Sequence, residues 1–144
     1  MVSLNKVASR IARTFHVHAC SDVTGFGLLG HAAEMAMGSG VTIELDSGKL
    51  PVLPGAQQLA QNGFLTGGCH RNRAYLEDKV IIDRNVRADL LEVVFDPQTS
   101  GGLLIALPEK HAGNLVKKLR AAGIKSAAVV GRARGKREAW VYLA

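Results

Sequence analysis

Hydrophobic residues recur along this chain with the spacing of helices in some stretches and the spacing of strands in others. Over residues 4–15 the apolar side chains fall at i, i+3, i+4 and i+7, which predicts an amphipathic helix. Alternation of apolar and polar residues over 41–46 predicts a strand. By the same criteria we expect further helices over 28–37, 54–61, 86–94 and 109–121, and short strands at 17–20, 80–82 and 127–130.

Three other stretches determine how these elements assemble. Residues 103–107 are apolar throughout, which is typical of a central strand covered on both faces. Residues 127–143 are expected to form a hairpin, in which a glycine- and arginine-containing turn at 131–136 joins two strands. Residues 62–73 are predicted to be a loop, because glycines and polar side chains dominate them. The pattern as a whole predicts one α+β domain, a mixed β-sheet flanked by helices.

A polar, glycine-bearing stretch at 20–31 precedes the second predicted helix. Asp22 offers a carboxylate, the hard oxygen donor that Mg²⁺ takes alongside substrate phosphates. Gly25 and Gly27 let the backbone turn sharply, and the free amides at the start of the helix can seat an anion. These features favour a metal–nucleotide or phosphate site. The alternative is a tight turn that Asp22 only caps, since a lone Gly-x-Gly is weak support.

The same chemistry occurs a second time, in the stretch 96–102, immediately before the apolar run. It combines a carboxylate, an amide, two hydroxyls and paired glycines in seven residues. Two such turns in one small chain favour a functional site. The intervening stretch 69–73 adds a histidine and two arginines, which could meet phosphates or could form a plain surface loop.

Composition places the chain among globular domains. It has 144 residues, 47% of them hydrophobic, which suits one domain with a real core. The two cysteines, Cys20 and Cys69, lack metal-site spacing, which indicates a reduced, cytoplasmic protein without a zinc site. No run approaches the roughly 18 apolar residues that cross a membrane, so no membrane partner is expected.

The positive charge is concentrated near the end of the chain. The net charge is +6, and residues 108–144 alone contain nine Lys or Arg against two Asp or Glu. Nucleic acid is one partner that such a surplus could take. Aromatic residues make up only 5% of the chain and are not interleaved with the basic residues, so no nucleic acid is expected. A solvated basic face, or one that meets an acidic partner domain, is favoured.

The two polar turns carry a family resemblance. SDVTGFGLLGHAAEMA at 21–36 and DPQTSGGLLIALP at 96–108 closely resemble the C-terminal domain of the selenophosphate synthetases (selenide, water dikinases). The stretch LPVLPGAQQLAQNG at 50–63 agrees as well, and the resemblance covers essentially the whole chain. The wider superfamily includes the aminoimidazole ribonucleotide synthetases, whose C-terminal domain supplies the expected fold.

The resemblance assigns roles to individual residues. In this family the aspartate matching Asp22 joins aspartates of an N-terminal domain in holding Mg²⁺ on the phosphates of ATP. Ser21 replaces a family threonine and keeps its hydroxyl. His31 matches a family position and is expected to pack and bond within the fold. The remaining residues expected to line the nucleotide site or to face the cleft between domains are Thr24, Gly25, Gly27, Asn72, Gln98, Thr99 and Ser100.

The resemblance also implies an activity and its limits. The family reaction converts ATP, selenide and water to selenophosphate, AMP and phosphate. Residues 1–144 would form a single C-terminal domain, while the ATP-binding N-terminal domain and the reactive Cys or selenocysteine lie outside this chain. Neither Cys20 nor Cys69 takes that role, so the chain alone is expected to be inactive. The full-length enzyme is expected to form a homodimer, largely through its N-terminal domain.

Two other readings stay open from the sequence. One is a stand-alone nucleotide- or phosphate-binding module without catalysis, built on the helix start after Gly25. The other is a nucleic-acid-binding domain built on the basic final quarter, which a steep salt dependence of binding would reveal.

Overall fold

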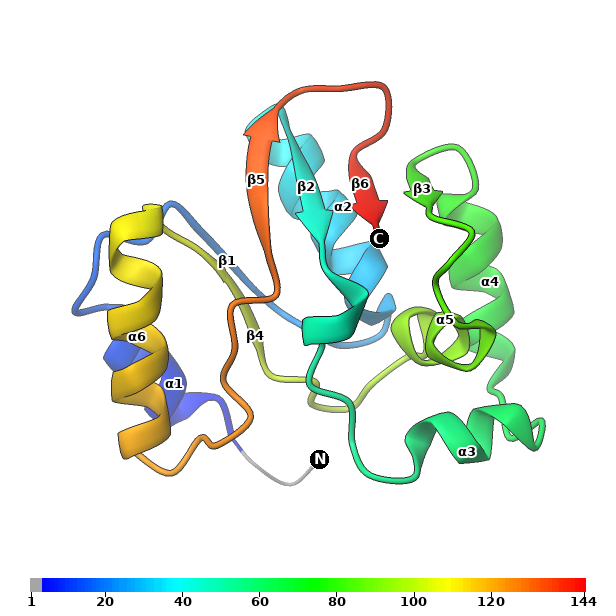
Figure 1. Cartoon of the computed structure of the whole chain (residues 1–144), viewed down its shortest axis with the longest axis horizontal. Coiled ribbons are helices and arrows are strands. Elements are labelled where there is room, and N and C mark those ends of the chain that lie inside the picture. Colours follow the sequence, from blue (N-terminus) through cyan, green and yellow to red (C-terminus); the bar gives the residue numbers. More distant parts are fainter. Residues whose placement is uncertain (1–3) are drawn as a thin grey trace.

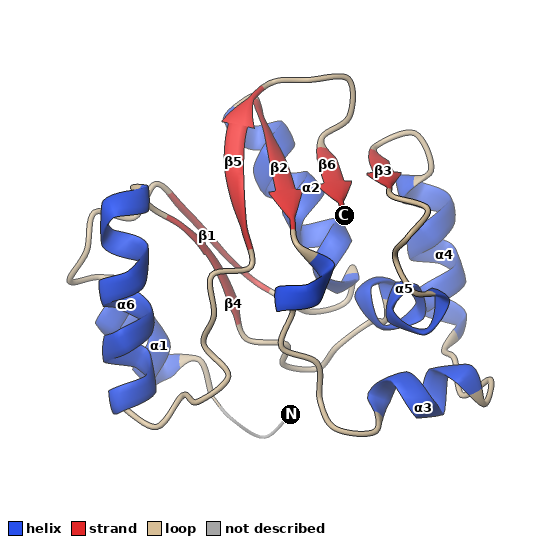
Figure 2. Cartoon of the chain, in the orientation of Figure 1, coloured by secondary structure: helices blue, strands red, loops and turns tan. Residues whose placement is uncertain are grey.

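The computed structural model describes residues 4–144, in which helices and strands alternate along the chain (Figures 1 and 2). The elements, in order, are α1 (Lys6–Ala12), β1 (Ala19–Asp22), α2 (Gly27–Ser39), β2 (Val41–Leu45), the 3₁₀ helix η1 (Ser47–Lys49), α3 (Ala56–Gln61), α4 (Gly67–Leu76), β3 (Val80–Ile82), α5 (Ala88–Phe95), β4 (Leu103–Ala106), α6 (Glu109–Ala121), β5 (Gly131–Gly135) and β6 (Val141–Leu143).

The core lies between a four-stranded sheet and α2. The strand order is β3-β6-β2-β5, with β6 parallel to both β3 and β2, and with β5 antiparallel to β2. Helix α2 lies behind the sheet in Figure 1 and packs against β2 and β6. Its inward face consists of Leu29 and the alanines Ala32, Ala33 and Ala36, all fully buried. Side chains this small let the helix axis approach the sheet closely.

A second, two-stranded ribbon stands apart from this sheet. Strands β1 and β4 pair antiparallel, from Ala19 opposite Ala106 to Asp22 opposite Leu103. Helices α1 and α6 pack together beside the ribbon, at the left of Figure 1. The pairing of Asp22 with Leu103 places the end of β1 beside the start of β4. The two polar turns therefore leave the ribbon at the same end.

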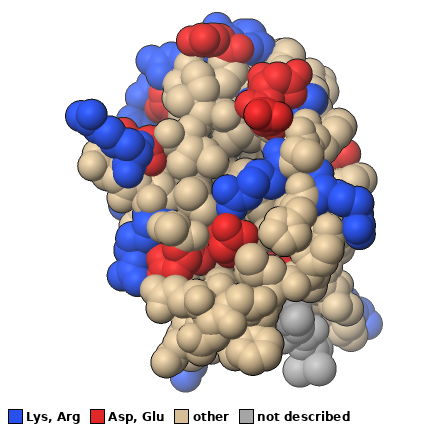
Figure 3. Space-filling model, turned by 90° about the vertical axis from the view of Figure 1, so that its right-hand side faces the viewer, with Lys and Arg blue, Asp and Glu red and all other residues tan. Residues whose placement is uncertain are grey.

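Helices α3, α4 and α5 cover the opposite side of the molecule. The buried apolar residues of α5, Leu90, Val94 and Phe95, belong to the core cluster that also contains the α2 side chains. Figure 3 shows this side: charges of both signs mix over its upper part, and its lower part is largely uncharged. Two apolar side chains at α3 are exposed: Leu59 within the helix is 54% exposed, and Phe64, just after it, is 73% exposed.

The mixed α/β fold class is confirmed, and helices α2, α3, α5 and α6 and strands β2 and β3 form close to where they are expected. The prediction of a hairpin at 127–143 is wrong. Residues 131–136, expected to be a turn, largely form β5, and β5 and β6 lie on either side of β2 instead of pairing with each other. Residues 127–130 are not a strand. Because β2 supplies backbone partners on both of its edges, the two segments need no contact with each other.

Three further expectations are corrected. The segment 62–73, expected to be a loop, contains most of the first two turns of α4. The Thr66 hydroxyl caps this helix by accepting a hydrogen bond from the Cys69 amide at 3.3 Å. The helix buries Cys69, Asn72 and Leu76. Strand β4 is not central, because β1 is its partner and all four of its residues are half-buried. Helix α1 is shorter than 4–15, and its expected inward residue Leu4 is 81% exposed.

Among residues 4–144, no helix is both long enough and apolar enough to cross a membrane.

Candidate functional site

Backbone hydrogen bonds join the two polar turns into one structure, which we call the double loop (residues 23–27 and 96–102). The Val23 amide donates to the Gly102 carbonyl at 3.0 Å, and the Gly101 amide donates to the Val23 carbonyl at 2.8 Å. The Gln98 amide donates to the Thr24 carbonyl at 3.0 Å. Segments more than 70 residues apart in the sequence are thus held in one fixed geometry. The structure brings together the two motifs that the sequence singled out.

Two glycines of the double loop have a left-handed backbone, Gly27 with φ +68° and Gly102 with φ +91°. A Cβ added at Gly27 would also lie 2.8 Å from the Val94 carbonyl oxygen. A Cβ at Gly101 would meet the end of the Gln98 side chain at 2.4 Å, a flexible group that can move away. Gly25 differs: it is exposed, its φ is not positive, and an added Cβ would meet nothing within 4 Å. The fold of this chain gives no reason for a glycine at position 25.

Asn72 holds the first turn from behind. It is 8% exposed, and its side-chain amide donates to the Gly25 carbonyl at 3.0 Å and to the Phe95 carbonyl at 2.9 Å. Both amide protons of this side chain are therefore used inside the protein. Asn72 supports the loop, and its expected exposure to the cleft between domains stays a prediction.

His31 connects the hydroxyls of the first turn to α2. It is 7% exposed, with Nδ1 3.3 Å from the Ser21 hydroxyl and Nε2 3.1 Å from the Thr24 hydroxyl. Glu34, one helical turn further along α2, places a carboxylate oxygen 3.5 Å from Nδ1. The packing and bonding role expected for His31 agrees with this position. The sequence did not indicate that both ring nitrogens reach hydroxyls of the site, or that Glu34 takes part.

Asp22 lies exposed at the end of β1, where the double loop begins. Its carboxylate and the Thr24 hydroxyl are hard oxygen ligands of the type that fits Mg²⁺. Among residues 4–144 there is no group of three or more His, Cys, Asp or Glu side chains that could enclose a metal. On the second turn, Gln98 is half-buried and Thr99 is exposed.

The pKa values of both cysteine thiols are raised above their ordinary value. Burial, with a hydrogen bond to Glu92, raises the pKa of the Cys69 thiol to about 11. Burial, with the nearby charge of Asp22, also raises the pKa of Cys20. A raised pKa lowers the thiolate fraction at neutral pH, and the thiolate is the reactive form. The absence of a catalytic role for either thiol stays a prediction.

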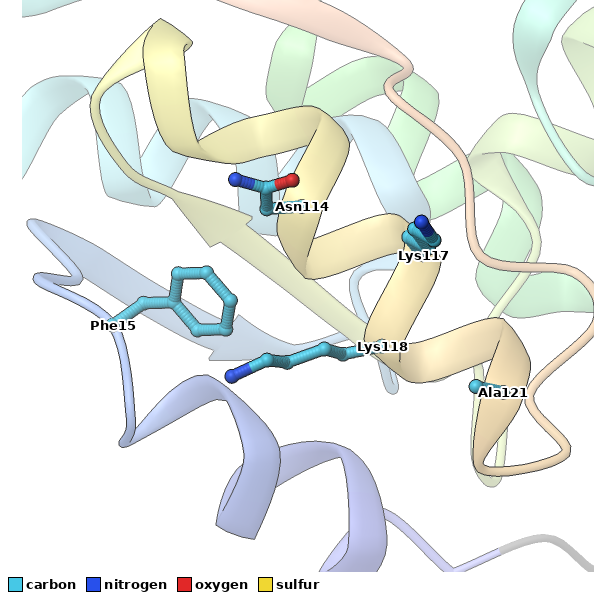
Figure 4. Close-up of a pocket in the computed structure, with 5 residues that line it drawn as sticks. All are labelled: Phe15, Asn114, Lys117, Lys118 and Ala121. Atoms are coloured by element: carbon cyan, nitrogen blue, oxygen red, sulfur yellow. The ribbon is translucent and has the colours of Figure 1, made fainter.

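A surface hollow at another place on the molecule shares no residue with the double loop. Phe15, Asn114, Lys117, Lys118 and Ala121 line it, with the Lys118 ammonium 5.0 Å from the centre of the Phe15 ring (Figure 4). None of these residues belongs to the double loop. The candidate site is thus the exposed surface around Asp22 and the double loop.

Comparison with known proteins agrees with this fold. Residues 1–143 match the C-terminal domain described as "AIR synthase related protein", and the chain belongs to that family. It is 48% identical over 143 residues to the selenide, water dikinase of Caldanaerobacter subterraneus subsp. tengcongensis, covering 99% of this chain and 41% of that protein. It is 45% identical over 143 residues to the selenide, water dikinase of Agathobacter rectalis, covering 99% of this chain and 41% of the relative.

A third relative is selenide, water dikinase 2 of Peptoclostridium acidaminophilum, 42% identical over 138 residues, or 96% of this chain and 40% of the relative. The chain thus spans about two fifths of the length of the curated relatives that it matches.

Proposed function

We propose that this chain is the C-terminal domain of a selenide, water dikinase and that it supplies one wall of a Mg-ATP site. The observation that carries the proposal is the double loop, which fixes both motifs of the relatives' family around an exposed carboxylate, Asp22. Similarity at 42–48% identity to three proteins of that name supports the same assignment.

In this proposal Asp22 binds the Mg²⁺ that accompanies ATP. One carboxylate binds Mg²⁺ weakly, because the ion keeps its waters until several ligands and phosphates replace them. The other carboxylates would come from an N-terminal domain outside this chain. Gly25, exposed and without a packing role, would allow that domain or the nucleotide to approach the backbone closely. Thr24, Gly27, Gln98, Thr99 and Ser100 would line the same wall.

The proposed reaction transfers a phosphoryl group from ATP to selenide, and water cleaves the remaining diphosphate to AMP and phosphate. Such transfers depend mainly on positioning and on neutralising charge in the transition state. Asp22 and its metal would contribute to charge neutralisation, and the double loop to positioning. The chain alone would be inactive. A reduced cytoplasmic location and a homodimer of the full-length protein belong to the same proposal.

Calorimetric titration of Mg-ATP tests this proposal directly. The chain is titrated alone and together with the portion of the Caldanaerobacter relative that it does not match, and selenide-dependent ATP hydrolysis is assayed in parallel. We expect binding and hydrolysis only when both parts are present. Asp22→Asn should weaken binding about tenfold or more, whereas Asp78→Asn, which changes an exposed carboxylate on another element, should not. Tight binding to the chain alone would instead indicate a stand-alone nucleotide module.

A further inference from the structure

His31 sits at the centre of a hydrogen-bonded chain that runs from α2 through the first turn. We infer that this chain holds the imidazole in its Nδ1–H tautomer, so that the Thr24 hydroxyl donates its proton to Nε2 and presents only lone pairs to the site. The Thr24 oxygen would then coordinate a cation or accept a hydrogen bond from the water bound to it. It would not donate a hydrogen bond to a phosphate oxygen. The orientation follows from the contacts alone; what occupies the site rests on the function proposed above.

The Ser21 hydroxyl determines the state of Nδ1. It donates its single proton to the Asp22 carbonyl oxygen at 3.1 Å. Toward His31 Nδ1, 3.3 Å away, the same oxygen can therefore only accept. The shorter distance to the Asp22 carbonyl favours this arrangement, in which a proton on Nδ1 makes the contact with Ser21 favourable.

Glu34 selects the same tautomer independently. Its carboxylate oxygen lies 3.5 Å from Nδ1, and an ionised carboxylate only accepts hydrogen bonds. An unprotonated Nδ1 would direct its lone pair at this negative charge. Ser21 comes from β1 and Glu34 from α2, so two separate elements favour a proton on Nδ1. The Phe26 ring, whose centroid lies 5.7 Å from that of the imidazole, offers no competing donor.

The consequence for Thr24 follows from the chemistry of a neutral imidazole. One ring nitrogen donates and the other accepts, so a proton on Nδ1 leaves Nε2 as an acceptor. The Thr24 hydroxyl, 3.1 Å from Nε2, then uses its only proton in this bond. Its oxygen keeps lone pairs for another partner. Two residues away in the chain, Asp22 also offers only acceptor oxygens, so the two side chains suit the same cation or its water shell.

The opposite tautomer would give Thr24 the opposite role. A proton on Nε2 would be donated to Thr24 and would release the hydroxyl proton for a phosphate oxygen. That arrangement requires Ser21 to abandon the Asp22 carbonyl and leaves Nδ1 facing Glu34 without a proton. His31 is thus a positioning residue: it orients the Thr24 hydroxyl, and that orientation decides whether Thr24 suits a cation or an anion.

Nitrogen-15 NMR of the histidine side chains tests the tautomer in this chain without any ligand. Long-range proton–nitrogen correlation at pH about 8, where ordinary imidazoles are neutral, distinguishes Nδ1–H from Nε2–H rings. Comparison with His31→Gln assigns the signal among the five histidines. We expect Nδ1–H, unchanged in Thr24→Val and shifted toward Nε2–H in the Ser21→Ala/Glu34→Ala double variant. An Nε2–H ring in the unsubstituted chain overturns the inference.

The cation preference is tested in the two-part mixture described above. Thr24→Val, which is nearly isosteric, should raise the Mg²⁺ concentration needed for ATP binding about tenfold, and Thr24→Ser should not. If Thr24→Val weakens ATP binding without changing the Mg²⁺ dependence, Thr24 is a phosphate donor and the inference fails. If the unsubstituted mixture does not bind Mg-ATP, the proposed function fails, while the NMR result still decides the tautomer.

Discussion

At the scale of single residues, the glycines of the first turn separate structural from functional requirements. Gly27 combines a left-handed φ of +68° with a close approach to the Val94–Phe95 backbone. The left-handed conformation costs a non-glycine residue about 1–2 kcal/mol, and crowding against backbone adds about 1–3 kcal/mol. The neighbouring Gly25 has neither constraint.

We therefore predict that Gly27→Ala lowers the free energy of unfolding by about 2–5 kcal/mol. Gly25→Ala should change it by less than about 0.5 kcal/mol, because the added methyl group meets nothing within 4 Å. Urea denaturation of the two variants beside the unsubstituted chain measures both values. Equal losses would mean that the backbone approach at Gly27 does not limit the fold.

Individual site residues were predictable to different degrees. Asp22 and the glycines stand out because the same combination of carboxylate, hydroxyls and glycines occurs in two turns of one small chain, and the family resemblance gave them roles. The inward orientation of Asn72 was not predictable, because it depends on the Gly25 and Phe95 carbonyls, 47 and 23 residues away. The Thr24–His31–Glu34 contacts could be suspected only from the i, i+3 spacing of the last two.

At the scale of elements, the start of α5 is held by a buried carboxylate. Asp89 is 6% exposed and accepts hydrogen bonds from Arg87, from Gln61 of α3 and from the Leu90 amide. The hydrogen bond from the Arg87 guanidinium lowers the pKa of Asp89 below its ordinary value. Since the folded pKa is depressed, this carboxylate stabilises the fold above its unfolded pKa, about 3.9, and the contribution is lost as the pH falls through the folded pKa.

Asp89→Asn should therefore lower the thermal midpoint at neutral pH and should flatten the loss of stability below pH about 4. The exposed Glu77, at the end of α4, provides a matched control as Glu77→Gln. Thermal unfolding followed by circular dichroism from pH 7 to pH 3 measures both effects. If the thermal midpoint of Asp89→Asn falls as steeply below pH about 4 as that of the unsubstituted chain, the role given to the Arg87 contact is contradicted.

The two elements that sequence patterns failed to predict share one cause. Helix α4 begins with paired glycines and is mostly polar, yet the Thr66 cap and three buried residues at helical spacing stabilise it. Strand β5 consists of Gly-Arg-Ala-Arg-Gly, residues that are poor strand formers in isolation. It forms because β2 offers an unpaired edge, which is a tertiary effect. Strongly periodic segments such as α6 needed no such help and were predicted accurately.

At the scale of the whole molecule, the basic final quarter of the chain is partly neutralised by the sheet. Arg132, Arg134 and Arg137 all approach the Glu44 carboxylate of β2, at 3.7, 3.6 and 2.6 Å. Three cations around one carboxylate repel one another. Their side chains are 51–66% exposed, so salt in solution screens both the attraction and the repulsion.

Replacement of Glu44 should expose this repulsion. Without the carboxylate the three guanidiniums face each other, so Glu44→Gln should lower the free energy of unfolding by roughly 1 kcal/mol at low salt. Added NaCl should then stabilise the variant, because it screens like charges, while the unsubstituted chain gains less. Asp78→Asn is the control, because Asp78 forms its ion pair with one cation, Lys79. Added salt should reduce the difference between this variant and the unsubstituted chain without raising the stability of the variant. Chemical denaturation in urea, which adds no ions, at two NaCl concentrations distinguishes these responses. If both variants respond to salt alike, Glu44 is an ordinary surface pair, and the basic edge of the sheet tolerates its charge without it.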